Sequence, residues 1–211
     1  MTPKEQRNRL LAGHIVKALN RRNMDAYYCE TASEAISKVL ELIPQGNTVS
    51  WGGSMTLRDM GLTRALHEAG GYTLLDRDEA KDRAEAAAIY LDAFRADYYL
   101  SSANGISEDG VIVNVDGTGN RVAAITFGPK HVIFVIGLNK VAQTPEAALM
   151  RARSTAAPIN TARFDIKTPC RADGVCHNCN SPQCVCNHIH FLRNSPNHRH
   201  TVVLVGEDLG Y

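Results

Sequence analysis

The sequence lacks both a dominant charge and any long apolar run, and these absences exclude several classes of protein. Its 211 residues carry a formal net charge of +1, so there is no electrostatic case for a nucleic-acid or acidic partner. No apolar run approaches the roughly 20 residues of a transmembrane helix. The amphipathic first turns, MTPKEQRNRLLAGHIVKAL, contain no signal-peptide core. We therefore expect a cytoplasmic protein with no membrane partner.

Two common catalytic signatures are also missing. The chain has neither Gly-x-Ser-x-Gly nor a Gly-x-Gly-x-x-Gly that follows a strand. It has no internal repeat or low-complexity segment. What remains is an ordinary globular composition, with 44% hydrophobic and 21% charged residues, which is enough for a full core. The length predicts a single domain over residues 1–211, with a Cys/His-rich segment at 168–200 inside it.

Hydrophobic periodicity alternates between strand and helix, which predicts an α/β fold with a mostly parallel sheet flanked by helices. Thr31 or Ser33 is placed to cap the second helix, and Pro158 is expected to break the last. Charged residues such as Arg77 are expected on a solvated helix face. The predicted strands are 24–29, 48–51, 72–75, 98–100, 111–115, 132–136 and 201–205, and the predicted helices are 4–22, the segment after the cap to 43, 57–69, 78–94, 122–127 and 145–153.

Two glycine-bearing loops follow predicted strands, at residues 52–56 and 116–121. Glycines let the backbone approach a ligand closely with its N–H groups pointing outward, and parallel sheets place ligands at the carboxyl ends of their strands. An anionic small molecule is the predicted ligand. The same residues also suit plain turns. The candidate binding residues are Gly52, Gly53, Ser54, Thr56, Asn104, Asn114, Gly117, Thr118, Gly119, Asn120 and Arg121.

Two carboxylates near these loops are candidates for general acid–base chemistry. Glu108 precedes the 111–115 strand and Asp116 follows it. A pair of carboxylates in one site can divide the work of proton donor and acceptor. The sequence identifies no further partner for either of them, so whether the chain is an enzyme stays open.

Five of the six cysteines lie within residues 170–186, with the spacing C-x5-C-x2-C-x4-C-x-C. In a reducing compartment such a cluster favours a metal over disulfides. Four thiolates suit either Zn²⁺ or an iron–sulfur cluster, and reduced thiols in a packed tail are the plain alternative. The spacing of Cys176 and Cys179 lets two thiolates reach one metal ion, and Cys170 with one of Cys184 or Cys186 could supply the remaining ligands.

Several stretches resemble the LUD domain, the lactate-utilisation family that was formerly a domain of unknown function. The resemblance runs from about Gln6 to Tyr211 and is carried by the cysteine segment that begins at Pro169 and by the following stretches: VSWGGSMTLRDMGL at 49–62, SANGISEDGVIVNVDGTGNRVAAITFGPKHVIFVIGLNK at 102–140, and the closing GEDLGY.

The resemblance implies a fold similar to that of sugar-phosphate isomerases, CoA transferases and formyltetrahydrofolate cyclo-ligase. In those proteins a glycine-rich loop holds phosphate or CoA-type groups, and here it corresponds to residues 52–54. Their second turn corresponds to Gly110, Asn114, Gly117 and Thr118, and the lysine that ends the next strand to Lys140. Relatives with a cysteine tail match at Cys170, Cys176, Cys179 and Cys186, so the resemblance implies these four as metal ligands, whereas Cys184 stands where a basic residue is expected and is a further candidate.

The resemblance further implies a role in the oxidation of L-lactate or a related organic acid, as a component or accessory beside iron–sulfur oxidoreductase subunits. Two alternatives remain. One is an isomerase or transferase acting on a phosphorylated or CoA-linked substrate, with Glu108 or Asp116 as the base. The other is a ligand sensor that uses the same pocket without chemistry.

Overall fold

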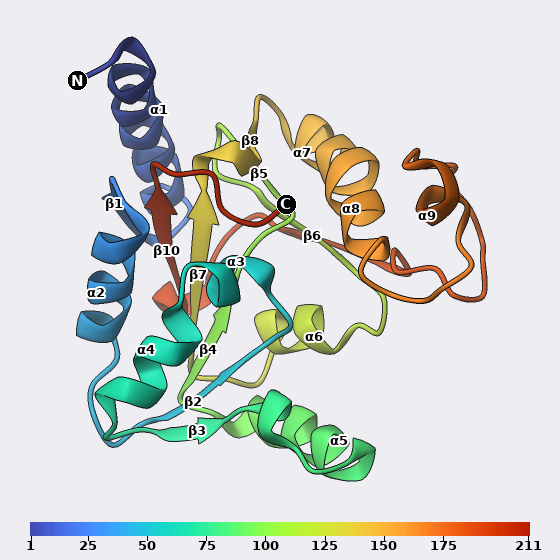
Figure 1. Cartoon of the computed structure of the whole chain (residues 1–211). Coiled ribbons are helices and arrows are strands. Elements are labelled where there is room, and N and C mark those ends of the chain that lie inside the picture. The colour runs from blue at the N-terminus through green and yellow to red at the C-terminus, as the bar shows by residue number, and fades with distance from the viewer.

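The structure is a computed structural model that describes all 211 residues. Its centre is a parallel sheet of six strands in the order β1-β10-β7-β4-β2-β3 (Figure 1). The α/β prediction with a mostly parallel sheet is therefore confirmed. The strands are β1 (Asp25–Cys29), β2 (Thr48–Trp51), β3 (Thr73–Leu75), β4 (Tyr98–Ser101), β7 (His131–Gly137) and β10 (His200–Val205).

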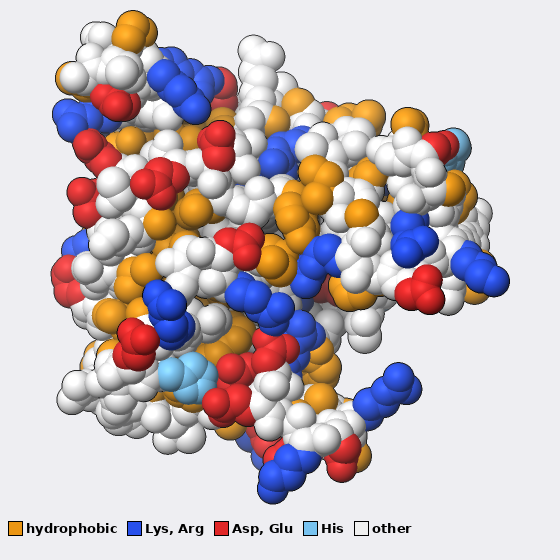
Figure 2. All heavy atoms as spheres, in the orientation of Figure 1, with side chains coloured by type: hydrophobic (Ala, Val, Ile, Leu, Met, Phe, Trp, Pro, Cys, Tyr) orange, Lys and Arg blue, Asp and Glu red, His pale blue; other side chains and the backbone are white.

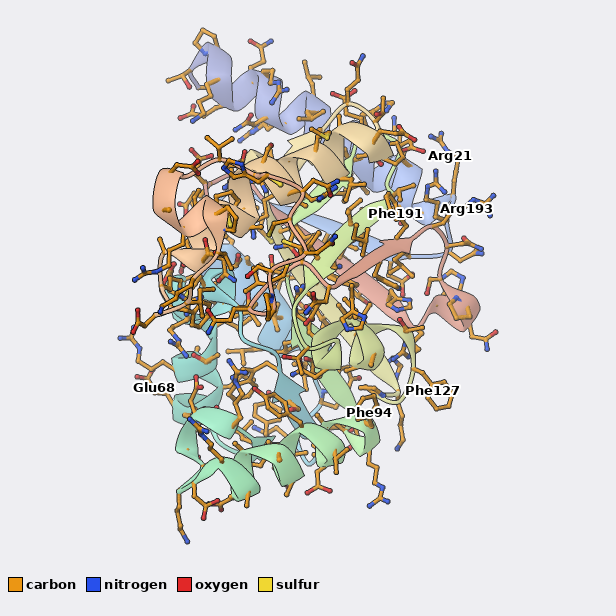
Figure 3. The ribbon with its side chains drawn as sticks, turned by 90° about the vertical axis from the view of Figure 1, so that its right-hand side faces the viewer. Arg21, Glu68, Phe94, Phe127, Phe191 and Arg193 are labelled. Atoms are coloured by element: carbon orange, nitrogen blue, oxygen red, sulfur yellow. The ribbon has the colours of Figure 1, made fainter.

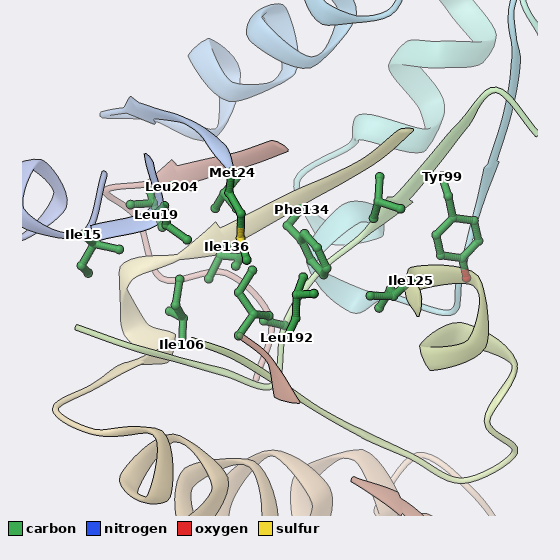
Figure 4. Packing of buried hydrophobic residues seen from close by; sticks show 14 of the residues in the cluster. Ile15, Leu19, Met24, Tyr99, Ile106, Ile125, Phe134, Ile136, Leu192 and Leu204 are labelled. Carbon is green, nitrogen blue, oxygen red and sulfur yellow. The ribbon is translucent and has the colours of Figure 1, made fainter. Parts of the chain in front are cut away.

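Both faces of this sheet are buried, because successive side chains of a strand point to opposite sides. In β7, Phe134 and Ile136 belong to one core cluster, whereas Ile133 and Val135 belong to the other. Helices α2 (Ala32–Leu42), α3 (Met55–Asp59) and α4 (Leu62–Ala69) cover the second cluster. On the opposite face, α1 (Pro3–Asn20) and α6 (Asn120–Thr126) pack with the first cluster, whose interlocking side chains Figure 4 shows.

A second, four-stranded sheet lies on that same face, in the order β8-β5-β6-β9. Its Ile106, Ile112 and Leu192 join the first core cluster. Helix α7 covers its other side, where Ala148 packs with Val113. From the side, Phe191 marks the outer strand β9 (Figure 3). The strands are β5 (Gly105–Ser107), β6 (Ile112–Asp116), β8 (Val141–Ala142) and β9 (His188–Leu192).

This second sheet corrects one expectation. The segment 111–115 was predicted as a neighbour in the parallel sheet, but β6 runs antiparallel to both β5 and β9 in the smaller one. Strands β5 and β8, with three and two residues, are too short to show a period in the sequence. Strand β9 has the sequence HIHFL and looks like a polar tail rather than a strand.

Helix boundaries follow local capping chemistry, with three corrections. Thr31 caps α2 as expected, accepting the Glu34 N–H. The predicted helix 57–69 is two helices, because Gly61, with φ of 83°, turns the chain between α3 and α4. The predicted helix 78–94 is shorter: Asp82 caps α5 (Arg83–Asp92), and single 3₁₀ turns flank it.

The third correction concerns Pro158, which does not break the last helix. Helix α7 (Pro145–Arg151) continues through a π turn (Ala152–Ala156) into α8 (Ala157–Thr161). In the π turn the N–H of Ala157 bonds to the carbonyl of Ala152, and this shift of register accommodates a residue that has no N–H of its own. A last short helix, α9 (Pro169–Asp173), opens the cysteine segment. No helix in the structure has the length and apolar character needed to cross a bilayer.

Candidate functional site

Two adjoining cavities, of about 90 and 250 Å³, open where the loops after β2 and β6 meet the end of α8. We call them together the cationic cleft. Both are lined by Gly53, Ser54, Met55, Val115, Arg121, Asn160 and Arg163. The smaller one reaches inward to Lys140, and the larger one runs past Gly117 to the cysteine segment. The two glycine-bearing loops predicted to face one another therefore line a common space.

The cleft carries a strong excess of positive charge, although the chain as a whole is almost neutral. Five cationic side chains line it and Asp116 is the only carboxylate among the lining residues. Figure 2 shows Lys and Arg side chains gathered at the centre of this face, between the helices of the large sheet and the α7–α9 region. Fields of one sign focus in a concave site and attract the opposite charge. The five cations are Arg58, Arg77, Arg121, Lys140 and Arg163.

Arg121, in the first turn of α6, is held by four groups before any ligand arrives. It donates to the side-chain oxygens of Asn114 and Asn104 and, at 2.7 Å, to the carbonyl of Val115. Its Nε also lies 3.4 Å from Asp116 Oδ2. Most of its N–H donors are thus occupied by the protein. The guanidinium is a preorganised positive charge in the wall that both cavities share.

Asp116 organises the glycine turn by accepting two of its amides. Its Oδ1 accepts the N–H of Thr118 at 3.1 Å and that of Gly119 at 2.9 Å. The expectation that this turn points its N–H groups outward at a ligand is therefore wrong for these two residues. Because those two donors are used internally, positive side chains rather than the Thr118 and Gly119 amides are the groups of this wall that could interact with an anion.

Lys140 closes the inner end of the cleft. It is 3% exposed, and its Nζ donates to Thr56 Oγ1 at 2.7 Å and to Ser102 Oγ at 3.1 Å. Burial, together with the positive charges of Arg151 and Arg121, lowers the pKa of Lys140 to about 7. None of the charged groups that shift this pKa is acidic.

The glycines of both loops make room for specific neighbours. A Cβ at Gly52 would lie 2.8 Å from the Tyr99 hydroxyl and 3.1 Å from Arg121 Cδ, and one at Gly53 would collide with the Arg77 guanidinium. A Cβ at Gly117 would lie 3.2 Å from Val185 Cα. The first pair lets two arginines approach the strand end, and Gly117 lets the cysteine segment pass against the turn.

The structure brings most of the predicted binding residues together, with some exceptions. Gly52, Asn114 and Gly119 do not line the cleft, although each contacts a residue that does. The residues that line it are Gly53, Ser54, Thr56, Asn104, Gly117, Thr118, Asn120, Arg121 and Lys140, together with the candidate acid Asp116.

The predicted carboxylate pair does not form. Glu108 lies in the turn before β6, where its N–H bonds to the carbonyl of Ala142, and it lines neither cavity. Asp116 is at the other end of the same strand, which at roughly 3.3 Å per residue separates the two by well over 10 Å. Any acid–base chemistry in the cleft must use other groups than this pair.

Several residues of the cleft escaped the sequence analysis. Arg58 was assigned no role, and Arg77 was expected on a solvated helix face, but the Arg77 side chain is 27% exposed and donates to the Tyr90 hydroxyl. Asn160 and Arg163 come from the end of α8, and Tyr211 follows the last strand. Charged residues on helix ends give no local signal of their role, because only the fold brings them to the strand ends.

The five clustered cysteines line one cavity of about 160 Å³ beside the cationic cleft. All are free thiols, and the backbone N–H of Cys186 lies 3.3 Å from Cys184 Sγ. Burial, together with the neighbouring Cys184, Cys176 and Cys170, raises the pKa of Cys186 to about 12. The donor set suits a metal that prefers sulfur. No three of the sulfur atoms lie within 4.8 Å of one another. The one group of three potential metal ligands that does meet this distance consists of His67, Asp76 and Glu79, outside the cysteine segment.

The cleft and the cysteine cavity share Val185, which lines both. The segment that carries Cys184 and Cys186 is therefore also a wall of the cleft. It is tied to the glycine turn by Asn187, whose side chain donates to the Gly117 carbonyl at 2.9 Å. A shift of this shared segment at one cavity would therefore also move a wall of the other.

Comparison with known proteins agrees with this architecture. The model of the family described as "LUD domain" matches residues 12–205. A crystal structure of a DUF162 family protein from Deinococcus radiodurans superposes with a TM-score of 0.56 at 12% sequence identity, covering 94% of this chain and 98% of that one. At that identity the likeness concerns the fold alone. A search of curated proteins finds no match.

Proposed function

Because this chain belongs to the LUD domain family, we propose that it binds a small organic acid in the cationic cleft, as a component of or accessory to the oxidation of L-lactate or a related acid. The observation that carries this proposal is the set of five cations around a cleft with one carboxylate. Arg121 is already fixed by its protein partners. A preorganised charge binds an anion at a smaller entropic cost than a mobile one.

The size of the inner cavity supports a small ligand. At about 90 Å³, the part that contains Lys140, Arg121 and Arg163 suits an acid of few carbon atoms. The larger part, with Arg58 and Arg77, leaves room for a longer or phosphorylated anion. This second observation keeps the alternative of an isomerase or transferase acting on a phosphorylated or CoA-linked substrate.

Calorimetric titration with L-lactate, pyruvate, inorganic phosphate and CoA tests the proposal. The key variant is Arg163→Gln, which removes a cleft cation near the surface. Its matched control is Arg153→Gln, which removes an arginine that lines the cysteine cavity and not the cleft. Loss of one charge-assisted hydrogen bond costs about 1.5 to 3 kcal/mol, so the first variant should bind lactate at least tenfold more weakly, and the second should be unchanged.

The titration separates the candidate functions. Tight binding of phosphate or CoA without any binding of lactate or pyruvate would favour the isomerase or transferase alternative. Absence of binding for all four ligands, or equal effects of the two arginine variants, would show that the cleft is not the site.

We further propose that the cysteine segment holds a metal, as Zn²⁺ or as an iron–sulfur cluster, on four of its five thiols. The support is the gathering of five thiols around one cavity. When bound, Zn²⁺ would serve as a structural tie, whereas a cluster would carry electrons and fit partners that are iron–sulfur oxidoreductase subunits. The thiols of Cys170, Cys176, Cys179 and Cys186 are the proposed ligands, and Cys184 supplies an N–H···S contact beside them.

Elemental analysis of protein purified without oxygen decides between the metals. Iron with inorganic sulfide and a brown colour would support the redox role, and stoichiometric zinc in colourless protein would support the structural one. The matched control is Cys29→Ala, because Cys29 lies in the core of the large sheet away from the segment and its loss should leave the metal content unchanged. Metal-free protein with five titratable thiols in the segment would refute the metal proposal.

A further inference from the structure

Lys140 differs from the other six lysines of the chain in being buried. A lysine buried for electrostatic reasons normally pairs with a carboxylate, but the hydrogen-bond partners of Lys140 are two hydroxyls, those of Thr56 and Ser102. Its charged neighbours are Arg151 and Arg121. The amine also lines the inner cavity of the cleft, so its position is not explained by packing alone.

The surroundings of Lys140 are those of a reactive amine. Desolvation and a second cation beside it are the two features that make a lysine nucleophilic at neutral pH, since both favour its uncharged form. Here both are present: burial and the nearby arginines bring its pKa to about 7. Close to half of the Lys140 side chains would then carry a free lone pair at neutral pH, whereas an ordinary lysine carries almost none.

We propose that the Lys140 amine condenses with the carbonyl carbon of a 2-oxo acid, whose carboxylate is held by Arg121 and Arg163, to form a reversible imine. This inference rests on the proposed function and narrows it to the carbonyl partner of a 2-hydroxy acid. In such an acid the carbonyl carbon is bonded directly to the carboxylate carbon. Two arginines and one lysine on the wall of the same small cavity can therefore address both groups at once.

The reaction balances without any further reagent. The nitrogen lone pair forms a C–N bond, the carbonyl electron pair moves to oxygen, and a proton passes from nitrogen to that oxygen. The resulting carbinolamine loses water as the second C–N bond forms. Ser102 Oγ, which accepts a hydrogen bond from Nζ at 3.1 Å and lines the same cavity, is placed to relay these protons.

Trapping with cyanoborohydride tests the imine on the full chain. The protein is incubated with pyruvate and the reductant, and the modified residue is located by peptide mass mapping. We expect one adduct on Lys140, with a yield that rises with pH and reaches half its maximum near pH 7. Lactate with the same reductant is the control, since it has no carbonyl group and should give no adduct.

The native protein contains its own controls, because the peptide mass map reports the labelling of every lysine in one experiment. Exposed Lys130, which is paired with Asp97, is the internal control and should be labelled far less than Lys140, because its hydrogen bond to Asp97 raises its pKa. Lys140→Arg, which keeps a charge and cannot form the imine, should remove the adduct. Labelling spread over the exposed lysines, or absence of any adduct, would overturn the imine.

Parallel titration with lactate distinguishes this failure from failure of the proposed function. If lactate binds and pyruvate leaves no adduct on Lys140, the cleft is an acid-binding site and the imine is wrong. If neither lactate nor pyruvate binds and no adduct forms, both the acid-binding function and the imine are wrong. If the adduct forms on Lys140 although lactate does not bind, the imine stands and the cleft recognises the 2-oxo acid alone.

Discussion

The cationic cleft and the cysteine cavity are neighbours built in opposite ways. The walls of the cleft come from the ends of strands β2, β4 and β6, and its central Arg121 is fixed by hydrogen bonds to three other residues. The cysteine cavity is formed by loops and one short helix, and its sulfur atoms are not yet gathered as closely as a shared metal requires. The cleft is preorganised, whereas the cysteine segment would have to bring its sulfur atoms closer together to hold the proposed metal.

This difference indicates how each site contributes to the free energy of unfolding. In the cleft, each buried charge is stabilised by its partner. Removing one partner leaves the other charge buried and unpaired, which lowers the free energy of unfolding. In the cysteine segment, the thiols contribute little to stability by themselves, and the proposed metal, once bound, would stabilise the folded segment directly. The predictions below test this contrast.

The largest effect is expected for Arg121→Ala. This change leaves Asp116 buried without its ion-pair partner and the side-chain oxygen of Asn114 without its donor, and Asn104 Oδ1 keeps only the N–H of Val115. Breaking a buried pair costs about 3 to 5 kcal/mol, which chemical denaturation would measure as a lower free energy of unfolding. Arg121→Lys, which keeps the charge but not the planar fork, should lose less. A loss below about 1 kcal/mol for the alanine variant would contradict the view of the cleft as preorganised.

Lys140 should make stability depend on pH above neutrality. Its pKa in the folded protein is about 7, lower than the 10.5 of an ordinary lysine. Between those values the unfolded chain binds more protons, so the free energy of unfolding rises as pH increases through this interval and is lowest below pH 7. At about 1.4 kcal/mol per unit, the gain from pH 7 to pH 10 is about 3 kcal/mol.

Lys140→Met isolates this contribution, because it removes the charge and keeps much of the shape. The unfolding free energy of the variant should not depend on this titration. The value for the variant minus the value for the native protein should therefore fall from pH 7 to pH 10. A difference that stays constant from pH 7 to pH 10 would mean that Lys140 titrates like an exposed lysine and would remove the basis for its reactivity.

Gly117→Ala should disturb the wall between the two sites. The added Cβ would lie 3.2 Å from the backbone of Val185, so the cysteine segment must shift by a few tenths of an ångström. Overpacking of this kind costs about 1 to 3 kcal/mol. Hydrogen exchange should become faster in residues 184–187, while the amides of β7 remain protected. Unchanged exchange at 184–187 would show that the two cavities are not joined through this contact.

The smallest effect is expected for Cys179→Ser in metal-free protein. The side chain is only partly buried and forms no hydrogen bond in the structure, so the change in unfolding free energy should stay within about 0.5 kcal/mol. The same variant should lose the stabilisation that the native protein gains when zinc is added. Equal zinc-dependent shifts in melting temperature for the two proteins would contradict the role of Cys179 as a ligand.

The sequence predicted the large sheet well because its strands carry their own signal. The β-branched run of β7 and the short apolar runs of β4 and β10 lie between turns, and such runs are buried on both faces. The small sheet was missed because its partners have no comparable pattern. Strand β9 pairs Ile189 with Val115 and His190 with Asn114, and nothing in its own residues distinguishes it from a tail.

The cleft was predicted in part, for a similar reason. Glycines and a buried lysine next to strand ends can be recognised from their position in the chain. The roles of Arg77 and Arg163 depend on where an edge loop and the end of α8 come to rest, which no local pattern encodes. The expected outward direction of the Thr118 and Gly119 amides was wrong because the carboxylate of Asp116, two and three residues before them, accepts both N–H groups.

The position of β10 has a consequence for how the chain reaches this fold during synthesis. It lies between β1 and β7, and it joins Asp25 to Thr201 across most of the chain. Until residues 200–205 leave the ribosome, the edge of β7 and the whole of β1 have no partner, and unpaired edges invite association with other chains. We expect nascent chains that end before residue 200 to bind chaperones, and to release them once this strand inserts.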